Sequence, residues 1–311
     1  MRTLSIAETG ITAPNVTLGL MRIAEKSDDE IRALVSAARE AGIDFFDHAD
    51  IYSPGLTTHG CERRFAEAMQ LSAAQREEIT LQTKAGIVKD GPYYDFSYEH
   101  IVSSAEESLR SLQTDYLDIL LLHRPDILAE PEEVARAFDD LCASGKVRHF
   151  GVSNHTPAQI ELLRTAVTQP LTVNQMQLSL PHAAILAEGI MANTVGQSDA
   201  VSPDGAGIVE YCRQHRITLQ AWSPYQSAHG AFVGSAKYPE LNQVMDRLAQ
   251  KYGVTPTGIA TAWITRHPAG IQVVLGTTTP GRVIEAAAGS EIPLTRPEWY
   301  ELLRAAGHRV P

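Results

Sequence analysis

The chain has 311 residues, of which 44% are hydrophobic and 20% are charged, a composition typical of folded globular proteins. Its 26 Lys and Arg residues against 37 Asp and Glu residues give a formal net charge of −11, so we expect no nucleic-acid partner. No apolar run approaches the roughly 18 residues of a membrane span and the N-terminus has no signal-peptide core, which predicts a cytoplasmic protein without a membrane partner. Three cysteines without a CxxC pair indicate neither a disulfide framework nor a zinc ribbon.

Short aliphatic or β-branched runs alternate along the chain with amphipathic stretches of helical length, which is typical of repeated βα units and a parallel sheet. The predicted strands are residues 16–20, 45–47, 80–84, 116–123, 147–153, 173–177, 218–222 and 271–275. The predicted helices are residues 27–41, 62–69, 97–112, 131–145, 157–166, 207–215, 240–252 and 256–266, with two more that begin near 281 and 295. Capping boxes open the first helix, at Ser27 and Glu30, and the last, at Thr295 and Glu298.

Eight strands, each followed by at least one helix, predict a (β/α)₈ TIM barrel. No linker-like run of Pro, Gly or Ser divides the chain, so we expect a single domain over residues 1–311. Residues 3–11 would form an extra N-terminal hairpin over the barrel bottom, residues 186–204 a long loop on the opposite face, and the last helix a C-terminal tail. A doubly wound open sheet has the same alternation, and periodicity alone leaves it open.

Polar residues close most of the predicted strands. They are Asp47, Lys84, His123, Ser153 with Asn154, Gln175, and Ser223. Active sites of barrel enzymes lie on the loops that follow the carboxyl ends of the strands, so these side chains should share one rim. With the nearby Tyr52, the aspartate, lysine and histidine would form a set capable of proton transfer.

Several short segments together point to a family. They are FDHADIY at 46–52, QTK at 82–84, LLHRP at 121–125, GVSN at 151–154, NQ at 174–175 and AWSP at 221–224. In this order and spacing the chain resembles the aldo-keto reductase family, most closely a bacterial branch of oxidoreductases, from Val16 to about Gly289. The resemblance implies a (β/α)₈ barrel that uses NADPH without a Rossmann domain, and the sequence indeed has no GxGxxG motif.

The resemblance implies reduction of aldehyde or ketone carbonyls to alcohols, with a small-molecule substrate. Hydride delivery to the carbonyl carbon leaves negative charge on the oxygen, and Tyr52 would be the general acid that protonates it. The ammonium group of Lys84 should lower the pKa of Tyr52, and Asp47 should keep Lys84 charged by ion pairing. His123 would donate a hydrogen bond to the substrate oxygen.

The cofactor residues follow from the same resemblance. Ser153, Asn154 and Gln175 match positions that bind the nicotinamide carboxamide. Trp222, which Ser223 and Pro224 follow, matches the aromatic residue that stacks on the nicotinamide ring.

At the adenosine end, Thr277, Thr278 and Arg282 match residues that hold a 2′-phosphate, and Glu285 one that meets the adenine amine. Hydroxyl groups and an arginine at a helix start favour a dianion, which points to NADPH. Two positions depart from the pattern, because Gly276 stands where some members carry lysine and Ala286 where many carry asparagine.

Other interpretations stay open at the level of the sequence. The chain could be a non-catalytic dinucleotide-binding regulatory subunit. It could also be a metal-dependent barrel hydrolase in which His48 and Asp50, beside Asp47, join His123 as ligands. Cys61, near the start of a predicted helix, is a candidate reactive thiol. We predict no resident metal.

Overall fold

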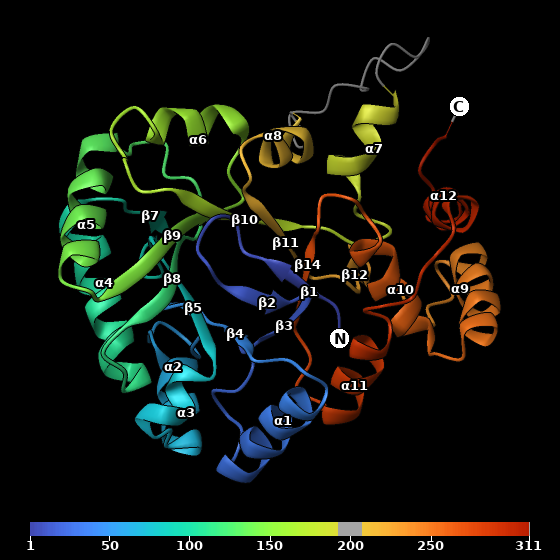
Figure 1. Cartoon of the computed structure of the whole chain (residues 1–311), viewed down its shortest axis with the longest axis horizontal. Helices are drawn as coiled ribbons and strands as arrows, with labels where there is room; N and C mark the ends of the chain where they lie inside the picture. Colours follow the sequence, from blue (N-terminus) through green and yellow to red (C-terminus); the bar gives the residue numbers. More distant parts are fainter. Residues whose placement is uncertain (192–206, 311) are drawn as a thin grey trace.

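The computed structural model describes residues 1–191 and 207–310 and contains a closed eight-stranded parallel barrel surrounded by helices (Figure 1). The barrel strands are β3 (Val16–Gly19), β4 (Phe45–Asp47), β5 (Thr80–Ala85), β8 (Leu117–Leu122), β9 (Val147–Ser153), β10 (Leu171–Gln177), β11 (Thr218–Trp222) and β14 (Gln272–Leu275). They pair in this order around the ring, and β14 closes it by pairing with β3. The closed ring confirms the predicted (β/α)₈ barrel and excludes the doubly wound open sheet.

Strands of the barrel are buried on both faces, which explains why they appear in the sequence as continuous apolar runs. All six residues of β8 are buried, for example. The outer side chains pack against the helices, as where Phe138 and Phe150 stack with ring centroids 4.0 Å apart. This packing fixes the strands, so the loops after their carboxyl ends are held by a rigid frame.

The helices follow the predicted pattern, with α1 (Asp28–Glu40) and α12 (Arg296–Ala305) opening on the predicted capping boxes. The others are α2 (Gly60–Met69), α3 (Ala73–Glu77), α4 (Tyr98–Leu112), α5 (Pro131–Ala143), α6 (Pro157–Leu163), α7 (Ala184–Met191), α8 (Ile208–Gln214), α9 (Pro239–Tyr252), α10 (Pro256–Thr265) and α11 (Pro280–Ala288). The predicted loop over 186–204 is wrong in its first part, because α7 occupies it. Residues 192–204 of that loop lie outside the described residues. The five-residue α3 was not predicted, since one helical turn has no readable periodicity.

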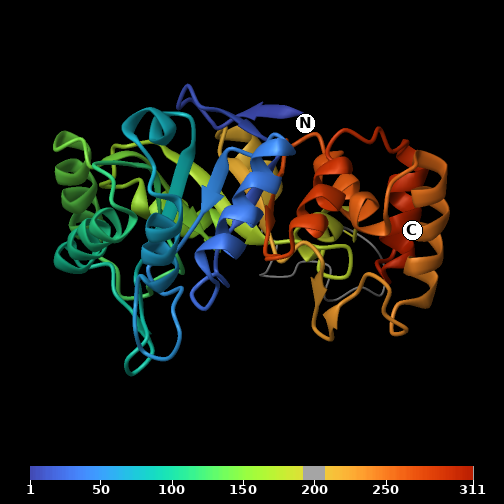
Figure 2. The same ribbon diagram turned by 90° about the horizontal axis from the view of Figure 1, so that it is seen from below.

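The N-terminal hairpin of β1 (Thr3–Ser5) and β2 (Thr12–Pro14) covers the barrel bottom, as predicted, and reaches three residues further than expected. Its Ile6 and Ala13 join the barrel-interior residues Phe45, Ile119 and Val173 in a separate apolar cluster. Figure 2 shows this hairpin and the long connecting loops at opposite ends of the barrel.

Ile6→Ala should lower the free energy of unfolding by about 2–5 kcal/mol, because it opens a cavity at a fully buried position. Urea denaturation measures this change. Ligand binding at the other end of the barrel should stay unchanged, and a variant as stable as the parent would contradict the packing role of the hairpin.

Two small hairpins extend the loops at the other end of the barrel. They are β6 (Ile87–Val88) with β7 (Tyr93–Tyr94), and β12 (Gln226–Ser227) with β13 (Gly230–Ala231). In residues 1–191 and 207–310, no helix has the length and apolar character needed to cross a membrane.

Candidate active site

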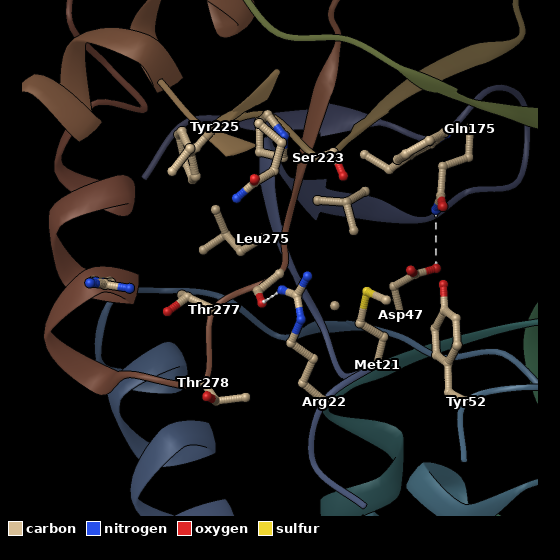
Figure 3. Close-up of a pocket in the computed structure, with 18 of the residues that line it drawn as sticks. Met21, Arg22, Asp47, Tyr52, Gln175, Ser223, Tyr225, Leu275, Thr277 and Thr278 are labelled. Carbon is tan, nitrogen blue, oxygen red and sulfur yellow. Dashed lines mark hydrogen bonds between the residues drawn. The ribbon is translucent and has the colours of Figure 1, made fainter. Parts of the chain in front are cut away.

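A cavity of about 590 Å³ opens at the carboxyl ends of the barrel strands (Figure 3). Among the residues that line it are twelve of the predicted site residues: Asp47, Tyr52, His123, Ser153, Asn154, Gln175, Trp222, Ser223, Pro224, Thr277, Thr278 and Arg282. The predicted Lys84 lies beneath the cavity, fully buried. Glu285 does not line the cavity.

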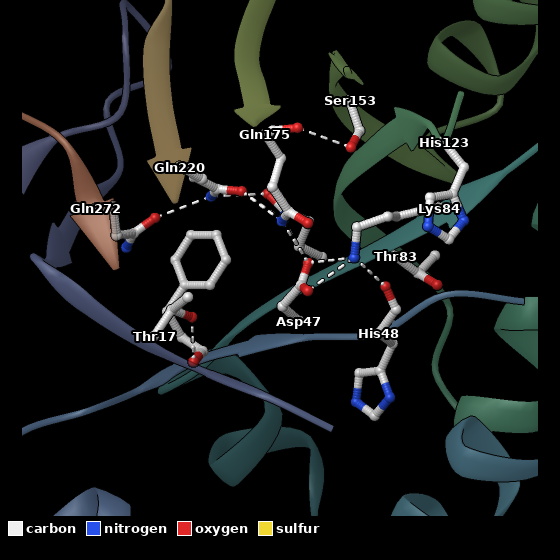
Figure 4. Close-up of polar contacts among 12 residues, drawn as sticks. Thr17, Asp47, His48, Thr83, Lys84, His123, Ser153, Gln175, Gln220 and Gln272 are labelled. Carbon is white, nitrogen blue, oxygen red and sulfur yellow. Dashed lines mark hydrogen bonds and ion pairs between the residues drawn. The ribbon is translucent and has the colours of Figure 1, made fainter. Parts of the chain in front are cut away.

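Lys84 and Asp47 form an ion pair inside the barrel wall. The Nζ atom of Lys84 lies 2.8 Å and 2.7 Å from the two carboxylate oxygens of Asp47 and donates a third hydrogen bond to the carbonyl oxygen of His48 at 2.7 Å (Figure 4). Burial favours the neutral amine, but the charge of Asp47 and the neighbouring Tyr52 outweigh it, so the pKa of Lys84 is raised. The expected role of Asp47 in keeping Lys84 charged therefore agrees with the geometry.

Tyr52 lies at the cavity side of this pair. The Nζ atom of Lys84 is 5.3 Å from the centroid of the Tyr52 ring, and the ring meets that of His123 edge-on, with centroids 5.9 Å apart. Burial raises the pKa of Tyr52 more than Lys84 lowers it, so the net shift is upward. Lys84 lowers the pKa of Tyr52, as predicted, but a net lowering does not result, because the sequence does not reveal how strongly the surrounding protein desolvates the phenol. Tyr52 is consequently protonated at neutral pH.

His123 is neutral at physiological pH. Burial is the largest cause, and the positive charges of Lys84 and Arg124 add to it, so the pKa of His123 lies well below its usual value. A neutral imidazole still carries one N–H donor, which is what a hydrogen bond to a carbonyl oxygen requires.

A chain of buried glutamines holds Asp47 from below, and of its members the sequence analysis selected only Gln175, for a contact with the cofactor. Gln82 donates to Oδ1 of Asp47 at 2.6 Å and Gln175 donates to the same oxygen at 3.1 Å. Both also donate to Gln220, which donates in turn to Gln272 (Figure 4). These residues point into the barrel from separate strands. The sequence does show one sign of this chain, a polar residue within an otherwise apolar strand. Such a residue must find buried hydrogen-bond partners.

The predicted nicotinamide residues form one hydrogen-bonded group. Ser153 donates to the carbonyl oxygen of Gln175 at 2.8 Å, and Asn154 donates to Ser153 at 2.8 Å. The indole N–H of Trp222 donates to Oδ1 of Asn154 at 3.0 Å. Asn154 and Ser223 have φ of +63° and +53°, a left-handed backbone that non-glycine residues rarely adopt. Such strain is typical of functional sites, here at the ends of β9 and β11.

The opposite part of the cavity is polar and positively charged. Thr277 and Thr278 line it after β14, and Arg282 lies in the first turn of α11. Arg22, which the sequence analysis did not select, reaches across from the loop after β3 and donates to the carbonyl oxygen of Gly276 at 2.6 Å (Figure 3). A Cβ atom on Gly276 would lie only 3.2 Å from this guanidinium, so the glycine leaves room for it. Hydroxyls, two arginines and a helix N-terminus fit the phosphates of a dinucleotide.

The loop that carries Tyr52 is anchored at both ends by polar side chains. The ammonium group of Lys89 donates to the carbonyl oxygens of Ile51, Ser53 and Thr57 at 2.8–3.3 Å. At the other end of the loop, His59 pairs with Glu62 at 2.6 Å. These contacts fix the two residues that flank Tyr52.

The residues of the metal-site interpretation do not come together. His48 packs edge-on against Phe65, and Asp50 accepts a hydrogen bond from Ser104 at 2.8 Å, whereas His123 lines the cavity. Cys61 is fully buried, and burial raises the pKa of its thiol, so this cysteine has no character of a reactive thiol.

Fold and site thus define a barrel enzyme with a buried lysine–aspartate pair below a tyrosine and a histidine. The model of the Aldo/keto reductase family matches residues 15–305. The chain belongs to this family and is an oxidoreductase.

Individual relatives agree with this assignment. The uncharacterized oxidoreductase YcsN of Bacillus subtilis is 33% identical, with both chains covered completely. A 6-dehydroglucose reductase of Novosphingobium aromaticivorans is 35% identical over 98% of this chain and 96% of its own. In fold, the chain is similar to a thermostable aldo-keto reductase solved with the inhibitor epalrestat, with a TM-score of 0.77 and 22% identity over 98% of this chain and all of the other.

Proposed function

We propose that the protein is an NADPH-dependent reductase that converts aldehyde or ketone carbonyls of small molecules to alcohols, with Tyr52 as the general acid. The observation that carries the proposal is the fully buried Lys84, paired with Asp47 directly behind the Tyr52 ring. A buried ion pair costs desolvation energy, and a charge held at this position stabilises a phenolate.

Bound NADPH would supply a hydride to the carbonyl carbon. As the C=O π bond breaks, its electron pair moves to the oxygen, and Tyr52 transfers its phenolic proton there. The resulting phenolate is stabilised by Lys84 and regains a proton from solvent. His123 donates a hydrogen bond to the same oxygen and thereby orients the carbonyl. The reverse reaction uses the same groups, with the phenolate as base.

In this proposal Ser153, Asn154 and Gln175 hold the carboxamide of the cofactor and Trp222 stacks on its nicotinamide, with Ser223 and Pro224 beside it. Thr277, Thr278 and Arg282 hold the phosphate of the adenosine end. Glu285 at the adenine would require the base to extend beyond the cavity. Because two relatives are named 6-dehydroglucose reductases, 6-dehydroglucose belongs among the carbonyl compounds to be tested.

The first experiment is a fluorescence titration with NADPH and NADH, followed by assays of aldehydes and diketones at the nicotinamide absorbance. Tight NADPH binding with turnover is expected. Binding without turnover of any carbonyl would favour the regulatory subunit, and absence of binding would refute the proposal.

Arg282→Ala should weaken NADPH binding by about 10-fold to 100-fold, because a charge-assisted hydrogen bond contributes about 1.5–3 kcal/mol. NADH binding should change little, since it lacks the 2′-phosphate. Dissociation constants for both cofactors measure the difference. Equal losses for NADPH and NADH would show that Arg282 does not contact that phosphate.

A further inference from the structure

Most of the charged residues that line the cavity are arginines. They are Arg22, Arg124, Arg282 and one carboxylate, that of Asp47. Asp47 is neutralised by Lys84 at 2.7 Å, so the three guanidinium groups dominate the charge of the cavity. The cavity therefore favours anionic ligands, although the chain as a whole has a net charge of −11.

Two of the three arginines lie on the side assigned to the dinucleotide phosphates. Arg22 follows β3, and Arg282 follows β14, the strand that pairs with β3. Arg22 also contacts Gly276 directly before the threonines of that side. Under the proposed function, these two cations meet the phosphate groups of the cofactor.

Arg124 is on the other side of the barrel mouth. It follows β8, which is four strands away from β14 in either direction around the ring of eight. A cofactor phosphate held near Arg282 is therefore on the opposite rim. Arg124 comes directly after His123, the group assigned to the substrate oxygen, and its guanidinium reaches over Trp222 at the end of β11, the residue assigned to the nicotinamide. Under the proposed function its charge therefore lies at the reacting end of the cofactor, where the carbonyl of the substrate is held.

The guanidinium of Arg124 is also available to a ligand. It lies over the ring of Trp222, 5.6 Å from the ring centroid, and within residues 1–191 and 207–310 it makes no hydrogen bond or ion pair with protein. The nearby carboxylate of Asp126 is occupied by the backbone N–H groups of Phe96 and Leu128. A half-buried arginine without a carboxylate partner has N–H donors of its guanidinium group free to bind an anion.

We propose that Arg124 binds a carboxylate of the substrate, so that the preferred substrates are aldehydes or ketones that carry a carboxylate in the same small molecule. The inference rests on the proposed function for the position of the carbonyl, at Tyr52 and His123. An arginine can hold a carboxylate through two parallel N–H···O bonds, which adds orientation to charge attraction.

The test compares matched substrates that differ in charge. These are succinic semialdehyde against butanal, and para-carboxybenzaldehyde against its methyl ester, each with NADPH. The wild type should have a lower KM for the charged member of each pair. Arg124→Gln should raise KM for the charged member by about 10-fold to 100-fold, the loss of a charged hydrogen-bonded contact. For the neutral member KM should stay unchanged, and Arg124→Lys should lie between.

Arg136→Gln is the matched control, because Arg136 also lies over an aromatic ring, that of Tyr98 at 4.4 Å, but on the outer helix α5. Arg136→Gln should leave KM unchanged for both the charged and the neutral member of each pair. Equal KM values for both members of each pair in the wild type would overturn the proposal, as would an equal effect of Arg124→Gln on both members.

A binding measurement separates this proposal from the reductase assignment. Succinate is titrated into the protein loaded with NADP⁺, and tryptophan fluorescence reports binding beside Trp222. Succinate should bind the wild type and bind Arg124→Gln about 10-fold or more weakly. This result would support the carboxylate site even if no carbonyl were reduced. Equal affinity in the two proteins would overturn the site while leaving carbonyl reduction intact.

Discussion

Tyr52→Phe should lower kcat for carbonyl reduction by about 10²-fold to 10⁴-fold, the usual contribution of a general acid. The substitution removes only the hydroxyl, so the ring can keep its edge-on contact with His123, whose centroid lies 5.9 Å away. Cofactor binding should therefore be unchanged. Steady-state kinetics together with NADPH titration separate the two effects.

The pH profile supplies a second readout for Tyr52. Reduction needs the protonated phenol, and burial raises its pKa above the usual value for tyrosine. The wild-type rate of reduction should consequently persist into alkaline solution and fall only as the pH rises through this raised pKa. Oxidation of an alcohol, which needs the phenolate, should increase over the same range.

In Tyr52→Phe both limbs of the pH profile should disappear. Tyr98→Phe is the matched control, because the Tyr98 hydroxyl donates to Asp140 on the protein surface. A Tyr52→Phe enzyme with near-normal kcat would refute the general-acid assignment.

The eight strand–helix units of the barrel were predictable, although their periodicity alone did not distinguish a closed barrel from a doubly wound open sheet. A run such as residues 117–122 is buried on both faces and flanked by strong helix signals at Ser97 and Pro131. The order of the polar strand ends then placed Asp47 and Lys84 on one rim, since all parallel strands end on the same side.

The electrostatics of the site were not predictable in the same way. The direction of the Tyr52 pKa shift depends on whether burial outweighs the charge of Lys84, and only the folded structure shows this balance. Arg22 and Arg124 were also missed. A residue in a loop belongs to no regular pattern of buried and exposed positions, so the sequence does not show the direction of its side chain. Gln82 was missed because its partner Gln220 lies 138 residues further along the chain.

Asp47→Asn and Lys84→Met, made singly, should each abolish measurable reduction and lower the free energy of unfolding by about 3–5 kcal/mol, because each leaves one buried charge without its partner. Lys84 has no exposed surface and Asp47 is 2% exposed, so solvent screens neither charge. Urea denaturation and steady-state assays measure the two losses separately.

The double variant Asp47→Asn/Lys84→Met decides what the pair does. With both charges removed, no buried charge is left without a partner, so much of the lost stability should return. Activity should not return, because no ammonium would remain 5.3 Å from the Tyr52 ring to stabilise its phenolate. A double variant that regained both stability and activity would show that the pair holds the barrel together and takes no part in proton transfer.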